Sequence, residues 1–213
     1  MILLTGFEPF GGDEVNSSWL AALRAQDILR AEGLAVESVE LPCVFGESAV
    51  VLEAAMARLR PDVVVCIGLA GGRERVSLER VAINCDDARI PDNKGQRPID
   101  QEVIDGGPAA YFSSLPIKAA LRNLQIAGIK GEVSQSAGTY VCNHVFYALM
   151  HSLASRPGVL GGFVHVPYLP EHLPAGSTAP SLSLESMAEG IAVIVRTALQ
   201  PQGDIKISAG TIH

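Results

Sequence analysis

The sequence predicts an α/β fold with a mostly parallel sheet, formed by one domain over residues 1–213. Short apolar runs alternate with segments of helical periodicity, which is the order of elements in α/β proteins. The run that follows Asp62, VVVCIGLA, is continuously apolar, as expected for a strand covered on both faces. A chain of 213 residues with 48% hydrophobic residues can also bury a sizeable core.

The expected elements follow one another along the chain. Strands are expected at residues 2–4, 36–41, 63–70, 78–84, 132–136 and 161–168. Helices are expected at residues 17–32, 47–60, 117–127 and 183–199, and a further apolar helix follows Tyr140. Residues 86–108 are rich in Asp, Pro and Gly, and a loop of this length is often functional. The last dozen residues are expected to be either mobile or tied to a neighbour.

Charge and cysteine content exclude several classes of protein. The net charge is −7 and no basic block occurs, which argues against nucleic acid or an anionic membrane surface as partner. The start, MILLTGF, lacks the basic lead of a signal peptide, and no run approaches the ~20 apolar residues of a membrane span. The four cysteines are too widely spaced for a zinc ribbon or a disulfide scaffold. We therefore expect a soluble, cytoplasmic protein.

A cysteine stands where the small-residue turn SAGTYV becomes a helix. A helix start lowers the pKa of a thiol, so Cys142 is either reactive or simply a small buried hydrophobe. At 100° per residue, Phe146 and Leu149 lie within roughly 40° of Cys142, whereas His144 and His151 lie about 180–200° away. Neither histidine can serve as its base, and both are expected on a solvated helix face.

His165 is a better candidate for the base. Strict alternation in GGFVHVP places Phe163 and His165 on one face of the sheet. His165 is near the carboxyl end of its strand, and Cys142 follows the carboxyl end of the strand at 132–136. Ligands bind at that edge of open α/β sheets, so we expect both side chains to face one crevice. The alternative is a core histidine with satisfied hydrogen bonds.

A third group must orient the imidazole and stabilise its charged form. Five acidic residues are candidates by their place in the sequence: Glu74, Glu79, Asp86, Asp87 and Asp92. If residues 78–84 form a strand, Glu79 shares an apolar face with Val81 and Ile83, where a carboxylate needs a buried partner such as His165. The spacing favours Glu79 without excluding the other four.

Taken together, these segments resemble pyroglutamyl-peptidase I, also called pyrrolidone-carboxylate peptidase, a family of cysteine peptidases. The family's nucleophile pattern, S-x-x-A-G-x-[F/Y]-x-C-N-x-x-x-Y, is met by Ser134, Ala137, Gly138, Tyr140, Cys142, Asn143 and Tyr147. The segments LLTGFEPFGG, GLAGGRERVSLERVAINCDDARIPDN, GGFVHVPYLP and TAPSLSLE also match, in order. The resemblance covers nearly the whole chain, which makes it specific.

The resemblance implies an α/β/α sandwich with a mostly parallel twisted sheet, phosphorylase/hydrolase-like in type. It implies that Cys142 is the nucleophile, His165 the general base and Glu79 the group that orients it. The implied reaction is removal of an N-terminal pyroglutamyl (5-oxoproline) residue from peptides through a thioester, with no metal or organic cofactor. Homotetramers are common in the family, so this assembly is expected here.

The resemblance also implies a substrate pocket with apolar walls. Its residues are Phe7, Phe10, Leu69, Arg89, Ile90, Tyr140 and Val141, with Arg89 as an added oxyanion donor. Core packing is the alternative for the two phenylalanines. Leu69 stands where some relatives carry glutamine, so recognition of the lactam through that side chain is absent. Cys43 stands where some relatives carry threonine, and its thiol is expected near the pocket.

Two other classes of function remain. A nucleoside phosphorylase-like transferase would fit the sandwich architecture, because a fold does not determine a function. Such an enzyme needs phosphate-binding groups, and the sequence offers no convincing set. A non-catalytic binding or thiol-redox protein would contain a reactive Cys142 thiol but would turn over no amide.

Overall fold

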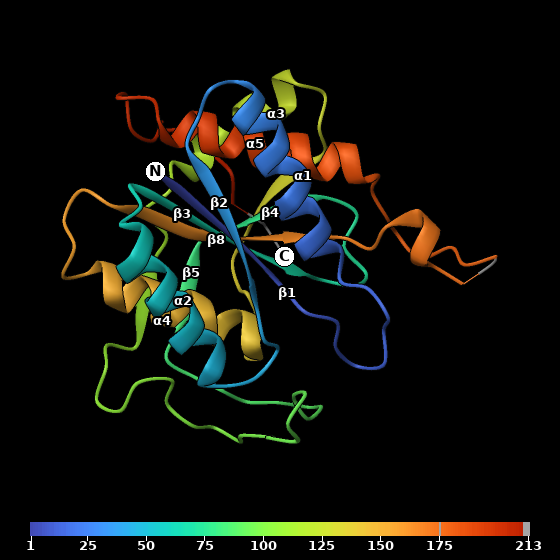
Figure 1. Cartoon of the computed structure of the whole chain (residues 1–213), viewed down its shortest axis with the longest axis vertical. Coiled ribbons are helices and arrows are strands. Elements are labelled where there is room, and N and C mark those ends of the chain that lie inside the picture. The colour runs from blue at the N-terminus through green and yellow to red at the C-terminus, as the bar shows by residue number, and fades with distance from the viewer. Residues whose placement is uncertain (175, 211–213) are drawn as a thin grey trace.

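A six-stranded sheet forms the centre of the molecule, and helices cover both of its faces (Figure 1). The computed structural model describes residues 1–174 and 176–210. The strand order is β2-β1-β3-β8-β4-β7, and every neighbouring pair is parallel except β4 and β8. The predicted α/β fold with a mostly parallel sheet is confirmed.

The elements have the following bounds. The sheet contains β1 (Ile2–Phe7), β2 (Val36–Leu41), β3 (Val63–Leu69), β4 (Val76–Glu79), β7 (Gly131–Ser134) and β8 (Leu160–Val166). A separate antiparallel pair is formed by β5 (Val81–Ile83) and β6 (Ala110–Phe112). The helices are α1 (Ser17–Ala31), α2 (Glu47–Leu59), α3 (Ile117–Ile126), α4 (Val141–Leu153) and α5 (Leu184–Ala198), with a 3₁₀ turn η1 (Pro170–His172). The helices lie where they were expected, whereas β6 and η1 were not predicted.

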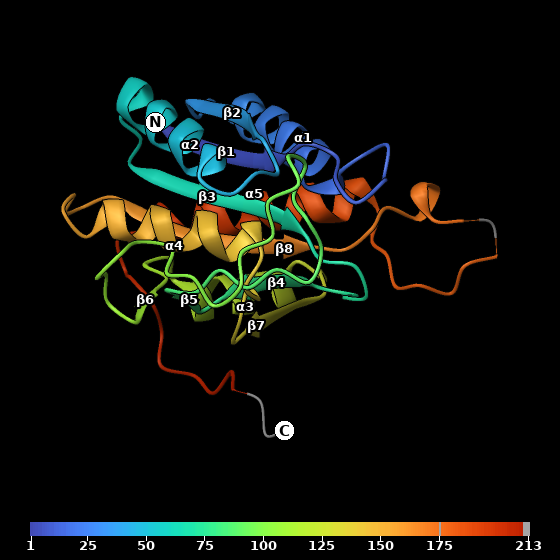
Figure 2. The same ribbon diagram turned by 90° about the horizontal axis from the view of Figure 1, so that it is seen from below.

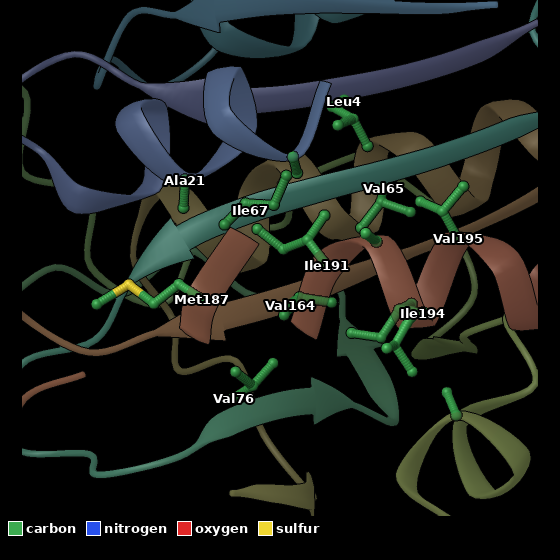
Figure 3. Packing of buried hydrophobic residues seen from close by; sticks show 14 of the residues in the cluster. Leu4, Ala21, Val65, Ile67, Val76, Val164, Met187, Ile191, Ile194 and Val195 are labelled. Atoms are coloured by element: carbon green, nitrogen blue, oxygen red, sulfur yellow. The ribbon is translucent and has the colours of Figure 1, made fainter. Parts of the chain in front are cut away.

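Two apolar clusters form on opposite faces of the sheet because side chains alternate along each strand. Helices α1, α3 and α5 cover one face, where Val65 and Val164 pack with Ile191 of α5 (Figure 3). Helices α2 and α4 cover the other face, where Cys66 and Phe163 are buried. Figure 2 views the molecule from the side of α2 and α4, and the long loop before β6 (green) crosses that side. No helix in the described part of the chain could span a membrane.

The predicted strand at residues 78–84 is wrong. The strand β4 ends at Glu79, and at Arg80 the chain leaves the six-stranded sheet to form β5, which pairs with β6. In β5 only Ala82 is buried, so Glu79 does not share an apolar face with Val81 and Ile83. The apolar run Val81-Ala82-Ile83 follows β4 after a single residue, which is why the sequence resembles one continuous strand.

The predicted route of Cys142 to the sheet edge is also wrong. Strand β7 is parallel to β4, and β4 is antiparallel to β8. Ser77 is paired with both Glu132 of β7 and His165 of β8, so β7 runs against β8 and its carboxyl end does not lie at the carboxyl edge of β8. The loop at residues 135–140 instead brings the start of α4 back over the sheet.

Candidate active site

The thiol of Cys142 lies over strand β3. Cys142 is the second residue of α4, whose N-cap residue Tyr140 makes no side-chain cap hydrogen bond. A Cβ atom added at Gly68 would lie 2.8 Å from Sγ of Cys142 and 2.8 Å from Cζ of Phe163. The absence of a side chain at Gly68 therefore provides the space that the thiol occupies.

The imidazole of His165 lies on the same face of the sheet, one strand away. Gly68 of β3 is the register partner of His165 in β8, and parallel strands are about 4.8 Å apart. The ring of Phe163, which contacts the position above Gly68, has its centroid 4.9 Å from that of His165. The thiol and the imidazole thus both lie beside the ring of Phe163, on one face of the sheet.

A buried carboxylate holds the imidazole. Nδ1 of His165 is 2.7 Å from Oε1 of Glu79, and both side chains are buried. An ionised carboxylate can only accept, so Nδ1 carries the proton and donates it to Glu79. Nε2 is then the unprotonated nitrogen, which can accept a proton from another group.

Arg73 binds the same carboxylate oxygen. Its Nη1 is 2.7 Å from Oε1 of Glu79, and its Nη2 donates to the carbonyl of Ser136 at 3.3 Å. Arg73 was not among the residues that the sequence indicated. Its position in the GGR turn shortly before the strand that ends in Glu79 is a signal that could have indicated it.

Burial shifts the pKa values of His165 and Cys142 in opposite directions. It lowers the pKa of His165 below its ordinary value, and the hydrogen bond from His165 to Glu79 opposes this shift. Burial also raises the pKa of the Cys142 thiol, with smaller contributions in the same direction from Cys43 and the Glu79 carboxylate, whereas Arg73 lowers it. At neutral pH the resting pair is therefore a neutral thiol beside a neutral imidazole.

Three of the predicted pocket residues line one cavity. Arg89, Ile90 and Tyr140 surround a space of about 410 Å³, together with Asp87, Gly138 and Thr139. Phe10 is half-buried, and its ring centroid is 6.0 Å from that of Tyr140. The hydroxyl of Tyr140 donates to the carbonyl of Pro91 and lies 3.9 Å from Sγ of Cys43. The cavity thus adjoins the start of α4, which carries Cys142.

The other predicted pocket residues do not line this cavity. Phe7 and Val141 are buried members of the apolar cluster under α2 and α4, and the ring of Phe7 packs 6.3 Å from that of Phe163. Leu69 ends β3 and is only 7% exposed. The side chain of Phe7 points from the end of β1 into the core, the alternative left open for it.

The other four acidic candidates do not bind His165. Asp86 is buried and binds His144, Asp92 accepts hydrogen bonds from backbone amides of its own loop, and Glu74 and Asp87 are exposed. Among the five candidates, Glu79 is the one that binds His165.

The predicted solvated position of His144 is wrong. His144 is buried, with Nδ1 2.7 Å from Oδ2 of Asp86, and its Nε2 accepts from the backbone amide of Gly46 at 3.0 Å. The ring of Phe45 lies edge-on to both His144 and Tyr140. The loops before α2 and before β6 cover this face of α4, and helical periodicity cannot reveal such a cover. His151 is half-buried against Tyr111.

Asn143 was matched only as part of the family pattern, with no role assigned to it. Its Oδ1 accepts from the amide of Ile83, and its Nδ2 donates to the carbonyls of Ile83 and Cys85. Through these bonds α4 is tied to β5, immediately next to Cys142. The available sequence signal for this role was an asparagine directly after the cysteine at a helix start.

The fold and the site together define a class of protein. A thiol at a helix start, beside an imidazole that a buried carboxylate orients, is the arrangement with which enzymes form and hydrolyse acyl intermediates. The protein is a cysteine-type hydrolase on an α/β scaffold.

Comparisons with known proteins specify the family. A family model described as "Pyroglutamyl peptidase" matches residues 1–201, and the chain belongs to this family. It is 49% identical to the pyrrolidone-carboxylate peptidase of Escherichia fergusonii, covering 100% of this chain and 99% of that protein. It is 51% identical to the pyrrolidone-carboxylate peptidase of Clavibacter michiganensis, covering 99% of this chain and 98% of that protein.

Solved structures agree with this assignment. The crystal structure of pyroglutamyl peptidase I from Bacillus amyloliquefaciens superimposes with a TM-score of 0.88 at 44% identity, covering 96% of this chain and 98% of that one. A mutant pyrrolidone carboxyl peptidase from Pyrococcus furiosus gives a TM-score of 0.84 at 39% identity, covering 93% and 97%.

Proposed function

We propose that this protein removes N-terminal pyroglutamyl residues from peptides, with Cys142 as nucleophile, His165 as general base and Glu79 as the group that orients His165. The observation that carries the proposal is the 2.7 Å bond between Glu79 and His165 on the sheet face where the Cys142 thiol lies over Gly68. The names of the relatives support the choice of substrate.

In the first half of the reaction, Nε2 of His165 accepts the proton of the thiol as Sγ of Cys142 attacks the carbonyl carbon that joins the pyroglutamyl ring to the next residue. A tetrahedral oxyanion forms. When the C–N bond breaks, His165 gives its proton to the leaving amine, and the pyroglutamyl group remains as a thioester. In the second half, His165 accepts a proton from water as the water oxygen attacks the thioester carbon. The C–S bond then breaks, pyroglutamate leaves, and His165 returns the proton to the sulfur, which restores the free thiol.

The start of α4 is suited to stabilise the oxyanion. The first N–H groups of a helix have no intrahelical partner, and here the N-cap side chain does not bind them. Donors of this kind are worth about 3–4 kcal/mol each in an acyl-transfer transition state. We propose that Arg89, which is exposed at the cavity, adds a further donor.

A neutral, flat lactam ring favours a pocket with apolar walls and few polar groups. We propose that Phe10, Ile90 and Tyr140 contact the ring directly. Phe7, Leu69 and Val141 are buried behind this surface, and we assign them to its support.

The test is hydrolysis of a pyroglutamyl-coumarin amide by the pure protein and four variants. We expect Cys142→Ala and His165→Ala to reduce kcat/KM by about 10³-fold or more, because the acyl step requires both groups. Glu79→Gln should cause a partial deficit, because the imidazole then loses its charged acceptor. The control is Cys85→Ala, since Cys85 is the other partly exposed thiol and should be dispensable.

Two results would reject the proposal. Undiminished turnover by Cys142→Ala would show that Cys142 is not the nucleophile. Failure of the wild type to cleave the amide, with phosphorolysis of a nucleoside in its place, would favour the phosphorylase-like alternative.

We also propose that the protein is cytoplasmic and forms a homotetramer. The four cysteines are all unpaired, as is usual in a reducing compartment. Large apolar side chains are exposed, including Ile90 near the cavity and Phe112 of β6, which is 70% exposed. Sedimentation analysis of the pure protein measures the assembly.

A further inference from the structure

We propose that Arg73 is a positioning residue of this site, which sets the proton affinities of His165 and Cys142 by binding the carboxylate oxygen that holds the imidazole. The inference rests on the proposed peptidase function and extends it to a residue outside the Cys-His-Glu set.

Arg73, Glu79 and His165 are joined by two hydrogen bonds that meet at one carboxylate oxygen. Oε1 of Glu79 lies 2.7 Å from Nδ1 of His165 and 2.7 Å from Nη1 of Arg73. The other oxygen, Oε2, is buried and has no hydrogen-bond partner among the described residues. Both donors therefore bind one oxygen, and Arg73 acts directly at the atom that orients the imidazole.

The buried carboxylate of Glu79 requires a permanently charged cation as partner. Glu79 is 0% exposed, and a buried carboxylate is costly unless it is paired. His165 is neutral at rest, because burial holds its pKa below the ordinary value. The guanidinium of Arg73, whose side chain is 26% exposed, supplies the missing positive charge while it remains partly in contact with solvent.

Arg73 also connects the two halves of the site. Its Nη2 donates to the carbonyl of Ser136, in the loop that leads from β7 to α4 and to Cys142. One side chain thus binds both the group that orients the base and the segment that delivers the nucleophile.

Several groups face the reacting pair from the surrounding elements. Glu79 of β4 and Arg73 of the preceding turn act on both His165 and Cys142. The thiols of Cys43 and Cys66 and the hydroxyl of Tyr140 also surround Cys142. Arg73 is the one cation in this set, and it lowers the pKa of both the imidazole and the thiol. Removing it should raise both values.

The experiment compares Arg73→Met, Arg73→Lys and a matched control, Arg75→Met. Arg75 lies two residues away in the same turn and pairs with the exposed Glu74, so it tests the loss of an arginine ion pair outside the site. The first readout is the pH profile of kcat/KM for the coumarin amide. The second is the pH dependence of alkylation of Cys142 by iodoacetamide, followed by mass spectrometry of the Cys142 peptide because Cys85 is also accessible.

For Arg73→Met, both limbs of the profile and the alkylation midpoint should move to higher pH by ~0.5–1 unit, as expected for loss of a partly solvated charge several ångströms away. Arg73→Lys retains the charge and should leave them near their wild-type positions. Arg75→Met should change neither. A structural role for Arg73 would lower the amplitude of the profile without moving its limbs.

The inference is overturned if correctly folded Arg73→Met has the same pH profile of kcat/KM and the same alkylation midpoint as the wild type. It is also overturned if Arg73→Lys shifts both by as much as Arg73→Met does. The proposed function fails in a different way. If the wild-type protein cleaves no pyroglutamyl amide, the peptidase assignment is wrong, and the alkylation midpoints still decide whether Arg73 controls the thiol.

Discussion

Gly68 is the residue at which β3, the Phe163 ring and the Cys142 thiol meet. A Cβ atom there would come within 2.8 Å of both Sγ of Cys142 and the tip of the Phe163 ring, closer than real contacts of this kind. In a close-packed interior neither neighbour can retreat without disturbing others. A glycine inside a buried strand normally weakens it, so the space left for the thiol is a reason for glycine at this place.

We expect Gly68→Ala to reduce kcat/KM of the pyroglutamyl-amide reaction by ~10-fold or more, because displacing the nucleophile by even 1 Å is costly for the chemistry. The matched control is Gly161→Ala in the adjacent strand, where the added methyl group would meet Leu153. That variant should lose stability and retain activity per folded molecule. Equal activity losses in the two variants would contradict the assigned position of the thiol.

At the scale of elements, the chain end supports a helix that lacks a cap of its own. Helix α3 begins after Pro116, which forms no side-chain cap hydrogen bond. Oδ1 of Asp204 accepts instead from the backbone amides of Lys118 and Ala119, at 3.0 and 2.8 Å. Asp204 thus ties the start of the tail to the body of the protein, and residues 211–213 lie outside the described residues.

Asp204→Ala should lower the free energy of unfolding by about 0.5–2 kcal/mol, the usual cost of losing a helix-capping oxygen. Asp204→Asn retains an acceptor and should lower the free energy of unfolding by only about a few tenths of a kcal/mol. Chemical denaturation measures both, and kcat/KM should stay unchanged because α3 lies on the face opposite the site. Equal stability in the alanine variant and the wild type would mean that the tail does not cap α3.

At the scale of the whole molecule, the buried neutral imidazole makes stability depend on pH. The pKa of His165 is lower in the folded protein than its ordinary value of 6.5, which it regains on unfolding. The unfolded chain therefore binds more protons below about pH 6.5. The contribution of His165 is fully present above that pH and is lost as the pH falls through its folded value.

The free energy of unfolding should accordingly fall between pH 7 and pH 5, with His165 contributing a slope of up to about 1.4 kcal/mol per pH unit. His165→Gln removes the titrating group and should flatten the curve. Denaturant unfolding at a series of pH values measures both proteins. Parallel curves would show that His165 does not titrate differently in the two states.

The helices, most strands and the two residues Cys142 and His165 could be inferred from local pattern, because each depends on neighbours in the sequence. Glu79 was one of five candidates, and it was favoured because of a predicted strand at residues 78–84, whereas the strand in fact ends at Glu79. The switch between sheets at Arg80 follows from pairing with distant strands, which the local sequence pattern does not record.

By itself, the sequence determined an α/β chain whose motifs match one family from end to end, since periodicity and motif spacing are local properties. Only the tertiary structure decided that β7 runs against β8, that His144 is covered, and that Arg73 and His165 bind one oxygen of Glu79. These facts depend on how segments far apart in the chain pack against one another. A buried charge selects its partners by distance in space, and sequence separation does not limit that choice.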